Sequence, residues 1–343
     1  MTWRLDNKTE TILSKADDRG EITHEEAVHL LRLPLESREA AALMRAARNM
    51  SLADFGRKGE NHMHIGLNTA PCPHNCKFCS LTREMGIFTE NVEFPEEQVL
   101  AWALEGERGG ADAINLMTTG DYPFSRLLEV GRMLSSRVGT PLVANTRDIS
   151  HKEGEALLAS GFSGFYHAVR LGEGTDTPFP ESRRIRTIQV IRDVGLLWMT
   201  CVEPVGPEHS PEEIARIMIL GREHGAAYSG VMRRINFPGS PLGHHGMISE
   251  LEMARMVAVS RLVMGDTPRA HCVHEPNAAA LMAGANLFFP EKGASPRDRE
   301  ADTGQGRGRG VAACGGIFRE MEVDPDLPSN VFPRESRVRL GAV

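Results

Sequence analysis

From residue 61 onward, short apolar segments alternate with longer amphipathic ones. Eight short segments are rich in β-branched and aromatic residues, and we expect strands at residues 64–69, 113–120, 141–146, 164–170, 197–205, 228–237, 268–274 and 285–289. Between them, apolar residues recur at helical spacing in residues 95–110, 124–137, 151–160, 181–195, 210–225, 249–263 and 275–284. Several of these helical segments begin with Ser or Pro followed by Glu and end at Gly, which are typical start and stop signals.

This alternation of strands and helices favours parallel strands joined by right-handed crossovers. Eight such units are enough to close a barrel. The pattern therefore predicts the α/β class and a TIM-type (β/α)8 barrel over residues 61–290. The alternative is a doubly wound open sheet.

Two further segments flank the predicted barrel. Residues 1–60 carry apolar residues at helical spacing, interrupted near Pro34, and we expect an N-terminal helical extension. Thr23 followed three residues later by Glu26 is typical of a capping box at a helix start. Residues 291–343 include a Gly-rich stretch and predict a loop-rich segment that caps the barrel mouth, with a disordered linker as the alternative.

Composition narrows the class of protein. Of 343 residues, 41% are hydrophobic, which is enough for a large core. The formal net charge of −7 provides no basic field for a phosphate backbone, so we expect no nucleic-acid partner. There is no run of about 18 apolar residues and no apolar signal segment at the N-terminus, so we expect no membrane partner and a cytoplasmic location. In a reducing compartment, the six cysteines are expected to be ligands or buried thiols.

Three cysteines, Cys72, Cys76 and Cys79, lie within eight residues just after the first predicted strand. In such barrels the loops after the strands carry the active site. Thiolates are the soft ligands that zinc and iron–sulfur clusters select. Structural zinc normally has four protein ligands, and His74 is too close in sequence to complete a regular knuckle. A four-iron cluster held by three cysteines would leave one iron open for chemistry.

The Cys-x3-Cys-x2-Cys spacing, with Phe78 before the last cysteine, resembles the motif of the radical S-adenosylmethionine (SAM) superfamily. This resemblance implies a [4Fe-4S] cluster on Cys72, Cys76 and Cys79, which also act as the catalytic residues. It implies that SAM binds the open iron and that one electron cleaves it to a 5′-deoxyadenosyl radical. An electron donor such as ferredoxin or flavodoxin is an implied partner.

Most of the chain is similar to the branch that contains biotin synthase, the HydE maturase and methylornithine synthase. The residues that carry this likeness are 183–208, with "RRIRTIQVIRDVG" and "LLWMTCVEPVGPE", and 278–289, with "AAALMAGANLFF". The likeness implies that Arg184 holds the methionine carboxylate of SAM, for which a guanidinium fork is suited. It also implies that SAM is contacted by Phe78, Thr119, Gly120, Asp121, Asn145, Arg170 and Glu173.

The alternatives for these residues are ordinary structural roles: a solvated helix position for Arg184, a Gly-Asp turn for Gly120 and Asp121, and a core aromatic for Phe78. Glu203 lies two residues after Cys201 in the same predicted strand, so the two side chains point to the same side. We therefore also expect Glu203 to face the cavity and bind a polar group of SAM or substrate.

Cys201, Cys272 and Cys314 are far apart in sequence, and the hypothesis is that they hold a second iron–sulfur cluster. Cys201 aligns with a biotin synthase residue that the resemblance identifies as a second-cluster ligand, whereas the two partner cysteines of that enzyme are missing here. Strand alternation leaves open whether Arg269 and His271 or Cys272 point inward. The alternative is that all three are buried thiols.

The C-terminal residues 293–314 resemble those of two-component lipoyl synthases. The expected function is therefore sulfur insertion of the lipoyl or biotin type, by a sulfurtransferase. A lipoyl carrier protein and a second radical SAM subunit are the implied partners. The alternatives are a radical SAM mutase, a metallocofactor maturase, and a non-enzymatic zinc or iron–sulfur scaffold.

Overall fold

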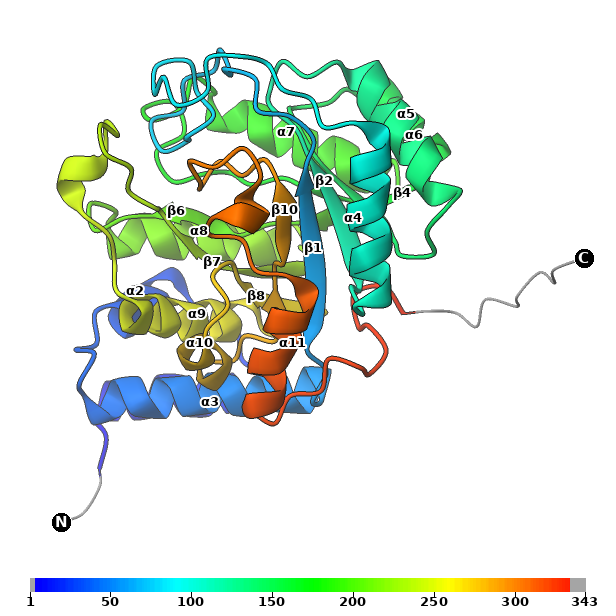
Figure 1. Ribbon diagram of the computed structural model, residues 1–343. Helices are drawn as coiled ribbons and strands as arrows, with labels where there is room; N and C mark the ends of the chain where they lie inside the picture. The colour runs from blue at the N-terminus through cyan, green and yellow to red at the C-terminus, as the bar shows by residue number, and fades with distance from the viewer. Residues whose placement is uncertain (1–3, 334–343) are drawn as a thin grey trace, which may run out of the picture.

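The computed structural model describes residues 4–333, and its parallel strands follow the predicted alternation (Figure 1). The strands, listed in chain order, are β1 (Glu60–Gly66), β2 (Ala113–Met117), β3 (Leu142–Asn145), β4 (Phe162–Tyr166), β5 (Leu197–Met199), β6 (Val202–Val205), β7 (Tyr228–Arg233), β8 (Ala270–Val273), β9 (Leu287–Phe288) and β10 (Glu291–Gly293). Their order in the sheet is β5-β4-β3-β2-β1-β9-β8-β7-β6, and β10 also pairs with β1.

One predicted strand, residues 197–205, is split into β5 and β6, and its two halves connect the two ends of the sheet. β5 pairs with β4, and β6 pairs with β7. On the β5 side, Trp198 accepts a hydrogen bond from the Ala227 amide at 2.8 Å, and the Thr200 amide donates to Tyr228 at 3.2 Å. Eight barrel positions result, so the (β/α)8 prediction is confirmed, and the open-sheet alternative is wrong.

Helices cover the outside of the barrel. They are α4 (Glu96–Arg108), α5 (Phe124–Ser135), α6 (His151–Ala159), α7 (Glu181–Asp193), α8 (Pro211–Glu223), α9 (Glu250–Met264) and α10 (Ala278–Met282). Successive strand residues face opposite sides, which creates two cores. Phe288 belongs to the core between strands and helices, whereas Leu287 and Phe289 belong to the core inside the barrel.

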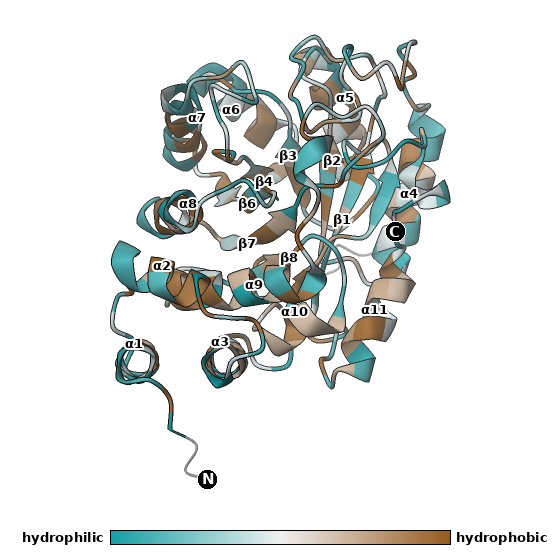
Figure 2. Cartoon of the chain, turned by 90° about the vertical axis from the view of Figure 1, so that its left-hand side faces the viewer, coloured by the Kyte–Doolittle hydropathy of each residue, from teal (hydrophilic) through white to brown (hydrophobic). Residues whose placement is uncertain are grey.

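Three helices precede the barrel: α1 (Asn7–Asp17), α2 (His24–Leu31) and α3 (Arg38–Phe55). The predicted capping box is present, because Thr23 and Glu26 each accept from the other's backbone amide. Figure 2 shows the three helices grouped beside α9 on one side of the molecule. No helix among residues 4–333 is long and apolar enough to cross a membrane.

The predicted C-terminal segment takes two paths. Residues 294–310 reach the barrel mouth, and α11 (Val311–Glu320) then runs back along the outside, where Phe318 stacks on Phe288. At the opposite end of the barrel, Ser329 Oγ donates to Glu60 Oε2 at 2.8 Å, and Phe332 packs 5.9 Å from His62 between ring centroids. Residues 334–343 of the predicted tail lie outside the described residues.

Candidate active site

A cavity opens at the carboxyl ends of the barrel strands. Asn145, Tyr166 and Arg233 line it, and they are the last residues of β3, β4 and β7. The three clustered cysteines line the same cavity, as do Ala294 and Arg297 from the C-terminal segment. This is the end of the barrel at which the fold places active sites.

Backbone hydrogen bonds hold the cysteine loop in place. The Cys72 amide donates to Leu81 at 2.8 Å, and Cys72 accepts from the Arg83 amide at 3.0 Å. The Cys79 amide donates to Cys76 at 3.0 Å. All three cysteines line the cavity from this one loop, and none of the three is in a disulfide.

The chemistry of this loop fits an iron–sulfur cluster. Burial raises the pKa of the Cys79 thiol, and the neighbouring sulfurs of Cys76 and Cys72 raise it further. Burial also raises the pKa of Cys76, which Arg170 partly offsets. Three soft donors on one loop suit a cluster such as [4Fe-4S].

The residues expected to contact SAM surround the same cavity. Seven of them line it: Phe78, Thr119, Gly120, Asn145, Arg170, Arg184 and Glu203. Asp121 and Glu173 do not line it but bond to residues that do. Asp121 accepts from Thr119 Oγ1 at 2.8 Å, and Glu173 accepts from Arg184 Nε at 2.8 Å. Their roles toward SAM stay predictions.

Arg184 is buried, so the alternative of a solvated helix position is wrong. Its Nη1 lies 3.1 Å from Asp148 Oδ1, and its guanidinium stacks 4.2 Å from the centroid of Phe179. Burial raises the pKa of Asp148, but His167 and Arg184 more than offset this and hold that pKa well below its ordinary value. The network fixes the orientation of Arg184 at the cavity wall.

A second ion pair lies beside this network, because the Arg170 amide also donates to Glu173 Oε1 at 3.4 Å. Arg170 Nε is 3.2 Å from Glu203 Oε1, and Tyr166 donates its hydroxyl to Glu203 Oε2. Burial lowers the pKa of Arg170, but Glu203 and Glu173 raise it above its ordinary value, so the guanidinium stays charged. Its Cζ lies 5.9 Å from the centroid of Phe78.

The structure brings two of the remaining cysteines together. Cys201 Sγ and Cys272 Sγ lie 3.0 Å apart, fully buried in the core inside the barrel. Cys272 therefore points inward and His271 outward, where His271 Nε2 bonds to Val257 O at 3.0 Å. Arg269 bonds to Val331 O at 3.2 Å, on the side of the barrel away from the cavity.

The three-cysteine second cluster is not assembled. Cys314 lies on α11 in the core outside the barrel, because the apolar face of that helix packs against the outer side of the strands. Two sulfurs on one tetrahedral metal would be about 3.8 Å apart, farther than the Cys201–Cys272 pair. Packed against Tyr228 and Met199 and outside the cavity lining, these two sulfurs do not fit a cluster.

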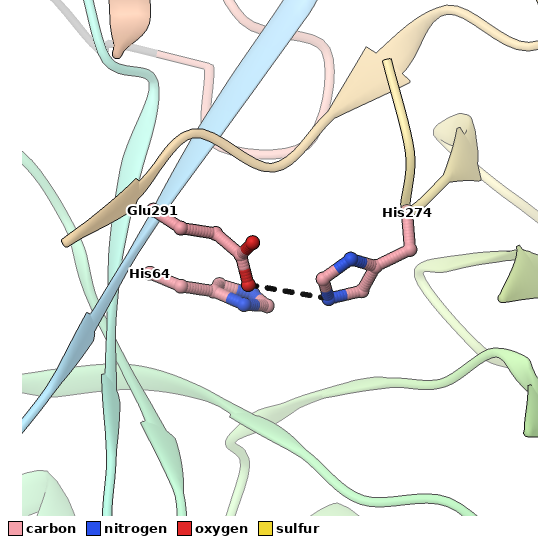
Figure 3. A group of neighbouring side chains, drawn as sticks. All are labelled: His64, His274 and Glu291. Atoms are coloured by element: carbon pink, nitrogen blue, oxygen red, sulfur yellow. Dashed lines mark ion pairs between the residues drawn. The ribbon is translucent and has the colours of Figure 1, made fainter. Parts of the chain in front are cut away.

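Several residues at the site were missed by sequence reasoning. The cavity is also lined by His64, Asn68, Tyr166, Phe179, His274, Glu291 and Arg297. Figure 3 shows His64, His274 and Glu291 pointing toward one another. The available signal was strand alternation, since His62 and His64 fall on the inward face of a strand extended by four residues.

Comparison with known proteins identifies distant relatives of the chain. No protein-family model matches the chain. Curated relatives include biotin synthase of Methylobacterium sp. (strain 4-46), 24% identical over 262 residues that cover 69% of this chain and 77% of that protein. Biotin synthase of Carboxydothermus hydrogenoformans is 23% identical over 314 residues that cover 87% of this chain and 96% of that protein.

Solved structures share the fold. Methylornithine synthase (PylB) has a TM-score of 0.76 and 17% identity, over 92% of this chain and 97% of that one. The hydrogenase maturase HydG from Carboxydothermus hydrogenoformans has a TM-score of 0.74 and 16% identity, over 91% of this chain and 78% of that one.

Proposed function

We propose a function on the premise that this chain is a radical SAM enzyme in the branch of biotin synthase, HydE and PylB, which its relatives and structural neighbours support. The proposal is that it binds a [4Fe-4S] cluster and SAM, and that it functionalises an unactivated C–H bond of a substrate in the barrel cavity.

One observation carries this proposal. Cys72, Cys76 and Cys79 lie at the mouth of a cavity that is also lined by Arg184 and Glu203. The three sulfurs would hold the cluster, which with SAM supplies a 5′-deoxyadenosyl radical when bound.

The chain's own residues would position the reactants. Arg184, held by Asp148 and Glu173, would donate hydrogen bonds to the methionine carboxylate of SAM. Glu203, held by Arg170 and Tyr166, would bind hydroxyl groups. The apolar side chains Phe78 and Met232 would exclude water from the reacting centre.

Anaerobic reconstitution with iron and sulfide tests the proposal. The purified chain, reduced with dithionite in the presence of SAM, is expected to form methionine and 5′-deoxyadenosine in equal amounts. Cys76→Ala serves as the control and should form neither product. Zinc as the only bound metal, with no 5′-deoxyadenosine, would instead support the scaffold alternative.

Sulfur insertion of the lipoyl or biotin type is the second candidate. It is favoured by the biotin synthase relatives. Its partners would be a lipoyl carrier protein and a second radical SAM subunit, with ferredoxin or flavodoxin as electron donor. Conversion of an octanoyl carrier peptide to a sulfur-containing product, detected by mass spectrometry, would establish it.

The mutase and maturase alternatives need no sulfur donor. They are favoured by the 3.0 Å distance between Cys201 Sγ and Cys272 Sγ, which is too short for two ligands of one metal. The iron content per chain separates them from sulfur insertion by a sacrificial cluster.

A further inference from the structure

His64, His274 and Glu291 meet at the floor of the cavity (Figure 3). They come from β1, the end of β8 and β10, and all three are buried. One ligand atom of each lies within 4.8 Å of the other two. Two histidines and a carboxylate are the ligand set of many mononuclear iron sites.

Arg297 argues against a metal at this position. Its Nη1 lies 2.5 Å from His274 Nδ1. A guanidinium can only donate, so Nδ1 is the acceptor, and Nε2 carries the proton of the neutral ring. Burial lowers the pKa of His274 well below its ordinary value, and Arg297 lowers it further, so the ring is neutral. A protonated Nε2 has no lone pair for a metal, and the charge of Arg297 repels a cation.

Two buried groups beside this ring have nitrogen atoms without a partner among the described residues. They are both ring nitrogens of His64 and Nε of Arg297. His64 is 1% exposed and Arg297 is 7% exposed. Unpartnered buried donors are rare and destabilising. Both residues line the cavity, so a bound acceptor would satisfy them.

The charged groups around the floor are paired with one another. Arg297 Nη2 and Arg307 Nη2 lie 3.1 and 2.6 Å from Glu275 Oε1, and Arg233 bonds to Oε2 of the same carboxylate. Arg307 is 44% exposed and therefore screened by water, so with Glu291 ionised the buried guanidinium groups of Arg233 and Arg297 balance the carboxylates of Glu275 and Glu291. Glu250 is 3.7 Å from Arg233, but it is 57% exposed and therefore screened by water.

We propose that His64, His274 and Arg297 form a receptor for a carboxylate group of the substrate. One ring N–H of His64, Nε2–H of His274 and Nε–H of Arg297 donate to its two oxygens. This inference rests on the proposed function and specifies its substrate class: a small free acid whose carbon chain extends from the floor toward the cysteine loop. A carrier-bound acyl chain has no such group at its far end.

Calorimetric titration of the reconstituted holoenzyme with SAM tests the proposal, with octanoate as the probe and octanamide as the uncharged match. Octanoate is expected to bind at least about tenfold more tightly than octanamide, because charge-assisted hydrogen bonds distinguish the two. Arg297→Gln and His64→Phe should each reduce the preference to less than about twofold. Arg147→Gln is the matched control, because Arg147 lines the cavity but pairs with Glu153 at 2.6 Å, and it should retain the preference.

Equal binding of the two probes by the wild type, or no octanoate binding, would overturn the receptor, and this comparison needs no variant to fold. Binding of one Mn²⁺ per chain that His64→Phe abolishes would overturn it in favour of a metal site. The formation of 5′-deoxyadenosine is measured in the same samples. A wild type that shows no preference between the two probes but still cleaves SAM refutes the receptor alone, whereas a wild type that does not cleave SAM refutes the proposed function.

Discussion

Cys201 Sγ lies 3.0 Å from Cys272 Sγ, and the two residues are 71 positions apart in the chain. Both thiols are free and belong to the core inside the barrel. The position of this pair bears directly on whether the protein carries one cluster or two.

We expect about four irons per chain after reconstitution, as for one four-iron cluster. The double variant Cys201→Ser, Cys272→Ser should hold the same amount, because the two sulfurs lie too close together to be two ligands of one metal. Iron and sulfide analysis of both proteins checks this. About eight irons in the wild type, decreasing to about four in the double variant, would instead support a sulfur-donating cluster.

Each of the substitutions Cys72→Ala, Cys76→Ala and Cys79→Ala should remove most of the iron and abolish SAM cleavage, because three sulfurs hold the predicted cluster. Cys314→Ala is the matched control, since this buried thiol lies outside the barrel. It should keep its iron and lose only about 1 kcal/mol of unfolding free energy from the missing side chain. Iron retained by the Cys76 variant would show that the loop does not hold the metal.

Arg184→Met should weaken SAM binding by about tenfold or more, because a carboxylate loses its bidentate donor. It should also lower the unfolding free energy by about 3 kcal/mol, since Asp148 and Glu173 stay buried with one fewer cation. Arg183→Met tests specificity: Arg183 also bonds Asp148 but is 48% exposed, so less than about 1 kcal/mol is expected. Equilibrium dialysis with SAM and urea unfolding measure both effects. Unchanged SAM affinity in the Arg184 variant would exclude the predicted contact.

Gly120→Ala should disturb the cysteine loop. A Cβ at Gly120 would lie 2.1 Å from His74 Cδ2, so the imidazole and the loop that carries it must move. Reduced iron retention is expected from metal analysis. Gly316→Ala has nothing within 4 Å of its Cβ and lies on an exposed position of α11, so it should increase stability by about 0.5–1 kcal/mol. Normal iron content in the Gly120 variant would show that the loop tolerates the shift.

His167 should make stability depend on pH. Burial lowers the pKa of His167 to about 4, although Asp148 lies 3.1 Å away, whereas the unfolded chain has the ordinary value near 6.5. Between these values the unfolded state binds a proton that the folded state does not. The unfolding free energy therefore falls as the pH decreases, with a contribution of about 2 kcal/mol at pH 5.

Urea unfolding at pH 7 and pH 5 measures this contribution in the wild type and in His167→Gln. The decrease between the two pH values should be smaller in the variant by about that amount. An equal decrease in both proteins would show that His167 titrates normally in the fold.

The sequence predicted the barrel well because strand and helix periods alternate clearly. Its errors have physical causes. β1 begins at Glu60, four residues before the expected strand, because its inward-facing positions include the polar residues His62 and His64, which a search for apolar positions does not reveal. The predicted strand at 197–205 contains a break, which the pairing of its two halves with different neighbours requires.

The site was predictable only where its residues lie close in sequence. Cys72, Cys76 and Cys79 share one loop, so their spacing alone indicated the chemistry. The floor joins His64 to His274 and Glu291, which are more than 200 residues away, and only the pairing of β1 with β10 aligns His64 with Glu291. Cys314 was wrongly assigned to the second cluster. It is buried in the apolar face of an amphipathic helix, and the sequence alone does not distinguish such a thiol from a metal ligand.

The contacts of Ser329 and Phe332 with the first strand have a kinetic consequence. They cover the end of the barrel opposite the cavity, and the packed core lies between them and the cavity floor, so reactants and products must pass through the cavity opening. Under the proposed function and the proposed carboxylate receptor, the substrate must bind at the floor before SAM covers it. The product must then leave after 5′-deoxyadenosine. Steady-state kinetics should then be ordered, with 5′-deoxyadenosine released first and the modified acid last.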